Sequence, residues 1–178
     1  MGGRTLELLE IMHKKLREAG YFLNQMNAVV QRVVGDPEEF EFLLSGLLSA
    51  SRSITDSLEN RRYRTWYETW KTGRTAAEQE LLEFMRVQRN SEVHHDGADV
   101  EVALQKVPIT EIHTGTRGHP AYGFHWWAPP GTLAPTVDLN AHQFELGGTK
   151  VEAFATCRDF IRLLGELVAA FEATHPRP

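Results

Sequence analysis

The residues best suited to chemistry lie together near the middle of the chain, in the stretch 81–97. Apolar side chains at helical spacing predict a helix there, and its C-terminal end carries Arg89, Asn90, His94 and His95. A guanidinium binds phosphate through two parallel hydrogen bonds. A histidine, with an ordinary pKa of about 6.5, takes up a proton at neutral pH. Together these side chains suit a phosphodiester substrate.

The spacing of these residues limits how they can meet. On a continuous helix Arg89 and His94 are about 140° apart and flank a face, whereas Asn90 and His94 share one. The Asp96-Gly97 pair favours the end of a helix. If the helix frays after Asn90, His94 can swing back toward Arg89. The alternative interpretation is structural, because the helix macrodipole favours cationic side chains near a C-terminus without any catalytic role.

The segment Arg89–His94, with the sequence RNSEVH, resembles the R-x4-6-H motif of the HEPN superfamily, in the common form where asparagine follows the arginine. The resemblance covers residues 36–94 and the C-terminal helix, and it leaves out residues 95–148. It implies a helical bundle that pairs as a homodimer, in which the two motifs meet across the two-fold axis and form one cleft. It also implies a ribonuclease that needs no metal.

In such an enzyme the four polar residues have separate roles. His94 acts as general base on a ribose 2′-hydroxyl, which attacks the neighbouring phosphorus. Arg89 clamps the phosphate and stabilises the charge that develops on it in the transition state. Asn90 orients the motif through a side-chain hydrogen bond, and His95 is the candidate acid for the leaving group. The expected products are a 2′,3′-cyclic phosphate end and a 5′-hydroxyl.

Two other classes of function fit the same residues. A HEPN-like module without turnover would bind a nucleotide or RNA, or act in oligomerisation, and the acidic balance of the chain favours it. Toxin and defence roles, with an antitoxin-like protein partner, stay open. A metal-dependent hydrolase on a helical bundle is the third class. The chain has 8 histidines, but none form an H-x3-H or H-E-x-x-H pair on a predicted helix, so we expect neither a metal nor another cofactor.

The charge distribution bears on a nucleic-acid partner. The net charge of −5 argues against broad nucleic-acid binding. Residues 1–90 are neutral, however, and residues 91–178 carry the whole deficit. A basic run upstream of the motif supplies the candidate substrate-binding residues Arg52, Arg61, Arg62 and Arg64, with a solvated face as the alternative. Tryptophans interleaved with these arginines could form a platform for single-stranded nucleic acid, but we favour core packing for Trp66 and Trp70.

Length and composition set the broad class. The 178 residues fit one domain, residues 1–178, with a good core, and 42% apolar with 24% charged content is typical of a globular protein. The single cysteine, Cys157, excludes an intrachain disulfide and fits a reducing compartment. The sequence shows neither an apolar signal core nor a run long enough to span a membrane. We therefore expect no membrane contact and a cytoplasmic location.

The periodicity of the chain predicts the elements that position the motif. Helices are expected over about 5–34, 36–58 and 61–71, then from Thr75 through the motif, and last from Thr149, which Glu152 would join in a capping box. Asp36 should cap the second helix and Pro37 should occupy its first position. Strands over 100–105, 122–127 and 142–146 predict an antiparallel meander that packs its aromatic side chains on the bundle.

The expected fold is therefore mainly α. It is an up-and-down bundle of four to five helices, with a small antiparallel β insertion at about 100–147, within the β-rich segment 98–148, before the last helix. The second helix is rich in small residues, among them Gly46, Ser49, Ser51 and Ser53. We favour close packing against the first helix, or across a dimer, as their role. The alternative is that Ser49, Arg52, Ser53 and Asp56 present hydroxyls and charges to the active cleft, and Arg52 is the best candidate there for a polar role.

Overall fold

The computed structural model describes residues 2–31, 37–59, 62–94, 100–108, 112–114, 122–124 and 136–175. The helices are α1 (Gly2–Val30), α2 (Pro37–Glu59), α3 (Arg64–Thr72), α4 (Ala76–His94) and α5 (Ala153–Thr174). The strands are β1 (Glu101–Pro108), β2 (Ile112–Thr114), β3 (Tyr122–Phe124), β4 (Thr136–Leu146) and β5 (Thr149–Glu152). This confirms the predicted fold class, mainly helical with a small antiparallel sheet before the final helix.

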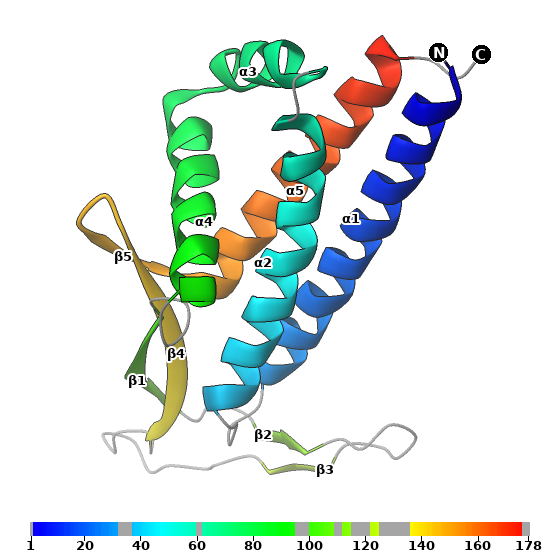
Figure 1. Ribbon diagram of the computed structural model, residues 1–178. Helices are drawn as coiled ribbons and strands as arrows, with labels where there is room; N and C mark the ends of the chain where they lie inside the picture. Colours follow the sequence, from blue (N-terminus) through cyan, green and yellow to red (C-terminus); the bar gives the residue numbers. More distant parts are fainter. Residues whose placement is uncertain are drawn as a thin grey trace.

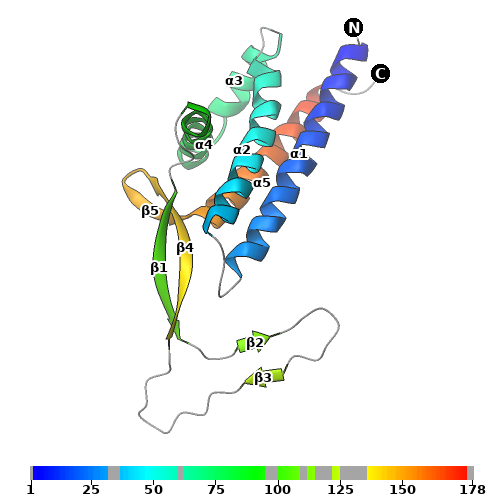
Figure 2. The ribbon, with the colours of Figure 1, turned by 60° about the horizontal axis from the view of Figure 1, so that its bottom comes forward.

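The long helices form the body of the molecule. α1 and α2 lie antiparallel and side by side, and α5 packs on α1 (Figure 1). α4 contacts both α2 and α5, while the short α3 lies across the end of the bundle between α2 and α4 (Figure 1). The sheet β1-β4-β5 projects from the opposite end of α4 (Figure 2). None of the described helices is long and apolar enough to cross a membrane.

Gly46 of α2 packs closely against α1, as the sequence predicts, whereas Ser49 is exposed and Ser51 lines a cavity. A Cβ atom built on Gly46 would lie 2.7 Å from two ring atoms of Phe22 in α1, closer than real Cβ contacts come. The glycine therefore lets the two helices approach until the aromatic ring of one rests on the backbone of the other. The hydrophobic core continues from this contact through α2, α4 and α5.

The start of α4 follows the prediction in detail. The backbone N–H of Thr75 donates to Glu78 Oε2 at 3.0 Å, and the backbone N–H of Glu78 donates to Thr75 Oγ1 at 3.3 Å. This reciprocal pair is a capping box, which satisfies two backbone donors at the beginning of the helix. The hydrogen bonds that the Glu78 carboxylate accepts from the backbone N–H and the hydroxyl of Thr75 lower the pKa of this carboxyl.

Several predicted helix boundaries are wrong. α1 ends at Val30 instead of about residue 34, and α3 begins at Arg64 instead of residue 61. Tyr63 directly precedes α3 because tertiary contacts fix it there: its hydroxyl lies 3.2 Å from Thr5 Oγ1, and its ring packs edge-on against Phe171 of α5. Pro37 is the first residue of α2 as predicted, while the proposed cap Asp36 lies outside the described residues.

The strand pairing also differs from the predicted meander. β1 pairs with β4, and β4 with β5, whereas β3 pairs with β2 in a separate two-stranded sheet. β4 begins at Thr136, well before the predicted start at 142, and β3 (Tyr122–Phe124) lies within the predicted 122–127, of which residues 125–127 are outside the described residues. Eight register pairs join β1 and β4, from Glu101↔Gln143 to Pro108↔Thr136. This ladder joins residues far apart in sequence, whereas the predicted meander would pair consecutive strands.

The predicted cap of the last helix is wrong as well. Gly147 (φ 58°) and Gly148 (φ 76°) form a two-residue turn between β4 and β5, in which Leu146 pairs with Thr149. Positive φ at both positions is the signature of a tight hairpin, so Thr149 begins a strand and the sheet extends past residue 148. Glu152 instead caps α5, because its carboxylate accepts hydrogen bonds from the backbone N–H groups of Phe154 and Ala155.

Two buried side chains of β4 attach the sheet to the bundle. Phe144 is 1% exposed and meets Phe84 of α4 edge-on, with ring centroids 5.3 Å apart. His142 is 3% exposed and stacks on Phe40 of α2, with centroids 3.9 Å apart and planes 7° from parallel. The expectation that the insertion packs aromatic side chains on the bundle holds for Phe144. The sheet is thus fixed to α2 and α4, the helices that border the candidate site.

Candidate functional site

The R-x4-6-H motif occupies the last turns of α4. The helix continues through His94, so the predicted fraying after Asn90 is not found. Residues 91–94 contain neither glycine nor proline, and the first strong breaker is Gly97, which explains why the helix continues. On this continuous helix the Cα atoms of Arg89 and His94 are about 140° apart around the axis and about 7.5 Å apart along it. The two residues therefore flank one face of α4.

The structure describes the side chains of only two of the four candidate catalytic residues. The Arg89 and Asn90 side chains are half-buried. His94 is described as the last helical residue, but its side chain and the whole of His95 lie outside the described residues. Arg89 is thus the motif side chain whose surroundings can be followed.

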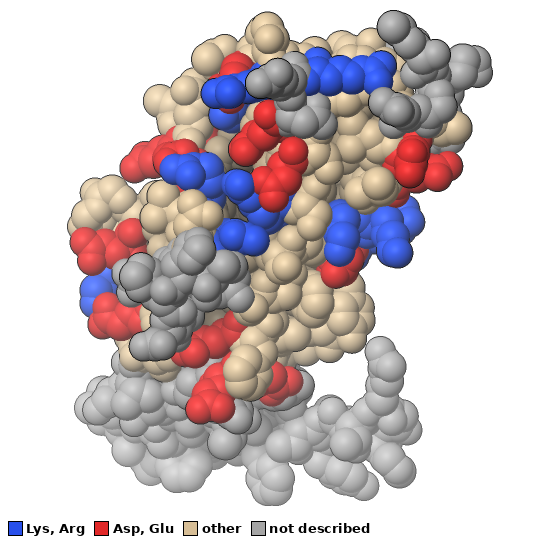
Figure 3. All heavy atoms as spheres, viewed as in Figure 1, with Lys and Arg blue, Asp and Glu red and all other residues tan. Residues whose placement is uncertain are grey.

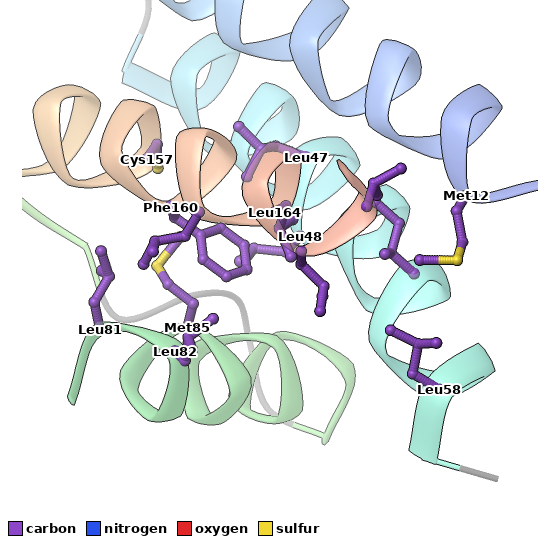
Figure 4. Packing of buried hydrophobic residues seen from close by; sticks show 14 of the residues in the cluster. Met12, Leu47, Leu48, Leu58, Leu81, Leu82, Met85, Cys157, Phe160 and Leu164 are labelled. Atoms are coloured by element: carbon purple, nitrogen blue, oxygen red, sulfur yellow. The ribbon is translucent and has the colours of Figure 1, made fainter. Parts of the chain in front are cut away.

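Arg89 lines a cavity of about 210 Å³ between α2, α3 and α4. Apolar side chains form its inner wall, and polar and charged side chains form its rim. The inner wall includes Leu48 of α2, Leu82 and Met85 of α4 and Phe160 of α5, which point toward one another in the core (Figure 4). The full set of lining residues is Leu48, Ser51, Arg52, Thr55, Glu59, Tyr67, Glu68, Lys71, Thr72, Gln79, Leu82, Glu83, Met85, Arg86, Arg89 and Phe160.

Each of the three helices contributes a polar stripe at helical spacing. On α4 the stripe is Glu83, Arg86 and Arg89, at three-residue steps. On α2 it runs from Ser51 and Arg52 to Glu59, and on α3 it includes Glu68 and Lys71; these also recur at steps of three to four along one helical face. Figure 3 shows the resulting gathering of basic side chains between α4 and α2, with acidic side chains beside them.

Most cations at the rim have a carboxylate partner. Arg52 Nε lies 2.6 Å from Asp56 Oδ1, and its Nη2 lies 3.8 Å from Glu59 Oε2. Lys71 Nζ lies 2.9 Å from Glu68 Oε1. These pairs hold four side chains of the rim in place, those of Arg52, Glu59, Glu68 and Lys71, and reduce its net positive charge.

The α4 stripe contains the tightest of these pairs. Arg86 donates from Nε and Nη2 to the two carboxylate oxygens of Glu83, at 2.8 and 2.5 Å. The hydrogen bonds from Arg86 lower the pKa of the Glu83 carboxyl, and the same contact raises the pKa of Arg86. By contrast, Arg89 has no ion-pair partner within the described ranges. Among the lining cations that the structure describes, its guanidinium is the one available to an incoming anion.

Two polar side chains lie deep in the cavity. Ser51 is 1% exposed, and its Oγ has no hydrogen-bond partner among the described residues. Tyr67 is 4% exposed, and burial is the main cause that raises the pKa of its hydroxyl. The Lys71 ammonium lies 4.6 Å from the centre of the Tyr67 ring, a cation–π contact at the rim. The inner wall thus combines apolar and aromatic surface with an unsatisfied hydroxyl.

Only some of the predicted substrate-binding arginines lie at this site. Arg52 lines the cavity with Arg89. Arg62 and Arg64 are exposed and are not among the lining residues, so the structure does not group them with Arg89. Arg62 instead lies over the Tyr63 ring, 5.1 Å from its centre. Arg61 lies outside the described residues.

The tryptophans and the cysteine belong to the core, as predicted. Trp70 is buried and Trp66 packs edge-on against Phe171, with ring centroids 5.1 Å apart. Cys157 is completely buried, and desolvation raises the pKa of its thiol, which makes it a poor nucleophile. In the part of the chain with described placement, no three or more histidine, cysteine or acidic side chains are arranged to hold a metal ion.

Most of the cavity-lining residues were not predicted from the sequence. Ser51, Tyr67, Lys71 and Arg86 were not identified as site residues, although polar side chains at helical steps on three consecutive helices were a usable signal. These stripes can be recognised as one site only when the order of the helices around the bundle is known.

Comparison with protein-family models, curated proteins and solved structures finds no match to this chain. The likeness to HEPN proteins therefore rests on the motif itself.

Proposed function

We propose that this protein is a HEPN-like, metal-independent endoribonuclease that acts as a homodimer through Arg89 and His94. The observation that carries the proposal is the state of Arg89: its guanidinium lines an open cavity and has no carboxylate partner among the described side chains. A guanidinium in that state can accept a phosphate, whereas its neighbours Arg52 and Arg86 are held by acids.

The proposed reaction needs one base, one phosphate-binding cation and one acid. His94 removes the proton from a ribose 2′-hydroxyl, and the oxygen attacks the adjacent phosphorus. The bond from phosphorus to the 5′-oxygen of the next nucleotide breaks, and His95 donates a proton to that oxygen. Arg89 stabilises the additional negative charge on the phosphate during the transfer, while Asn90 orients the motif. The products are a 2′,3′-cyclic phosphate and a 5′-hydroxyl.

The geometry of α4 supports a dimer as the active form. Because Arg89 and His94 flank a face of one continuous helix, a substrate lying on that face is contacted from both sides when a second motif faces it. The resemblance to the HEPN superfamily implies such a pairing across a two-fold axis. The proposal also includes a cytoplasmic location and an antitoxin-like partner, which would act by covering this face in a toxin or defence role.

The test is RNA cleavage by purified protein in the presence of EDTA. We expect His94→Ala to lower the rate about 10²- to 10⁴-fold and Arg89→Ala about 10²- to 10³-fold. Arg158→Ala is the matched control, since Arg158 is an exposed arginine of α5 outside the cavity. End analysis should find cyclic phosphate. Equal cleavage by all four proteins would overturn the proposal, because the activity would then come from elsewhere.

A second function is favoured by the cavity itself. Its apolar inner wall and the acidic balance of the chain also suit a HEPN-like module that binds a nucleotide or RNA without cleaving it. In that case Arg89→Ala weakens ligand binding, and no RNA is cleaved by the wild-type protein under any condition. Binding and cleavage measured on the same preparations separate the two functions.

A further inference from the structure

The cavity beside Arg89 has two chemically different parts. Its inner wall is apolar and aromatic, with Leu48, Leu82, Met85 and Phe160. Ser51 also lines the cavity; the residue is 1% exposed, and its Oγ has no hydrogen-bond partner among the described residues. Buried polar groups in folded proteins nearly always have a hydrogen-bond partner. A hydroxyl left unsatisfied in a residue that lines a cavity has a hydrogen bond to offer to a ligand group there.

The rim restricts the charge of that ligand. Arg52, Lys71 and Arg86 are each held by a carboxylate, which leaves Arg89 for one additional anionic group. Glu59, Glu68 and Glu83 also line the cavity and repel a second one. The rim therefore selects a ligand with a single phosphate over a polyphosphate or a long anionic chain lying in the cavity.

The size of the cavity restricts the body of the ligand. An apolar cavity of about 150 Å³ holds a benzene molecule, whereas drug-sized ligands occupy about 300–1,000 Å³. The cavity between α2, α3 and α4 has about 210 Å³, enough for one planar heterocycle with polar edges. A nucleobase has this size, apolar faces and hydrogen-bonding edges.

We infer that the cavity binds a single nucleotide, with its base against the inner wall, a base edge hydrogen-bonded to Ser51 Oγ, and its phosphate on Arg89. This inference rests on the proposed function, since it makes the cavity the subsite for the unstacked nucleotide whose 3′-phosphate is cleaved. It assigns to Ser51 and the apolar wall a role in selecting the base. Bases in single-stranded RNA are available for such insertion.

The direct test is calorimetric titration with four probes. Uridine 3′-monophosphate and adenosine 3′-monophosphate carry a base, whereas ribose 5-phosphate and inorganic phosphate do not. We expect at least one nucleotide to bind tenfold or more tightly than both probes without a base, and Arg89→Ala to weaken it at least tenfold. Equal binding of all four probes, or binding of none, would overturn the inference.

Ser51→Ala provides the sharper variant. Removing the hydroxyl should weaken nucleotide binding about 2- to 10-fold, which corresponds to the loss of one hydrogen bond, and should leave phosphate binding unchanged. The melting temperature of the free variant should not fall, because an unsatisfied polar atom has been removed. Ser53→Ala is the matched control: Ser53 lies on α2 outside the cavity and donates to the Ser49 carbonyl at 3.1 Å. Nucleotide binding within twofold for wild type and Ser51→Ala would refute the assignment.

The two proposals can fail separately. Suppose that wild type cleaves RNA and His94→Ala does not, but Ser51→Ala leaves nucleotide affinity unchanged. The cavity is then not the base subsite, and the ribonuclease proposal stands. If nucleotides bind with the expected dependence on Ser51 but no RNA is cleaved, the cavity assignment stands and the ribonuclease fails. The cleavage assay and the binding assay therefore test the two proposals independently.

Discussion

Substitution of Phe144 tests whether the β1-β4-β5 sheet and the helices fold as one unit. Phe144 is 1% exposed and meets Phe84 of α4 edge-on. Truncation of a buried phenylalanine to alanine costs about 3–5 kcal/mol, of which about 0.5–1.5 kcal/mol reflects the geometry of an aromatic pair. Since a domain is stable by only about 5–15 kcal/mol, Phe144→Ala removes a large share of the total.

The assay is urea unfolding followed by circular dichroism. The matched control is Phe42→Ala, because Phe42 is 70% exposed on α2 and its loss should change the free energy of unfolding by about 0.5 kcal/mol or less. A double-mutant cycle with Phe84→Ala should return a coupling of about 0.5–1.5 kcal/mol. If Phe144→Ala is no more destabilising than Phe42→Ala, Phe144 does not attach the sheet to the bundle and the docking described above is wrong.

Three further substitutions or conditions test local features. Burial lowers the pKa of His142 in the folded protein, so below about pH 6.5 the unfolded state binds more protons at this residue. The free energy of unfolding is therefore unaffected by His142 above about pH 6.5 and falls as the pH drops below that value. Urea midpoints at pH 5.5 and 7.5 should show this fall, and His142→Phe should remove it. Gly147→Ala should lower the free energy of unfolding by about 1–2 kcal/mol, because Gly147 has a φ of 58° that alanine rarely adopts. Gly147→Asn should be nearly neutral, and the melting temperatures of the two variants test this difference. Thr75→Ala should cost about 0.5–2 kcal/mol by loss of the capping box with Glu78, a result that an unchanged urea midpoint would contradict.

Features set by neighbouring residues could be predicted from the sequence. The capping box at Thr75 depends on one residue three positions away, and the small residues of α2 indicated close packing before Gly46 was seen against Phe22. Pro37 began its helix for a similar reason, since its fixed φ fits the first helical position. Each of these signals lies within a single turn or along a single face.

Features set by distant residues could not be predicted in this way. The pairing of β1 with β4 joins residues 28 to 42 positions apart, and nothing in either segment selects the other. The cavity likewise combines side chains of α2, α3, α4 and α5. The turn at Gly147 and Gly148 is a different case, because the two glycines are a local hairpin signal that the expectation of a helix cap at Thr149 obscured.

The closing pair of the β1-β4 ladder makes the fold modular. Pro108 and Thr136 face each other across two antiparallel strands, so their Cα atoms lie about 5 Å apart. We expect a two-residue Asn-Gly link to bridge such a gap, so that residues 109–135 can be exchanged for it while the β1-β4 ladder is kept. Variants with and without this segment would show which activities belong to the helices and the β1-β4-β5 sheet.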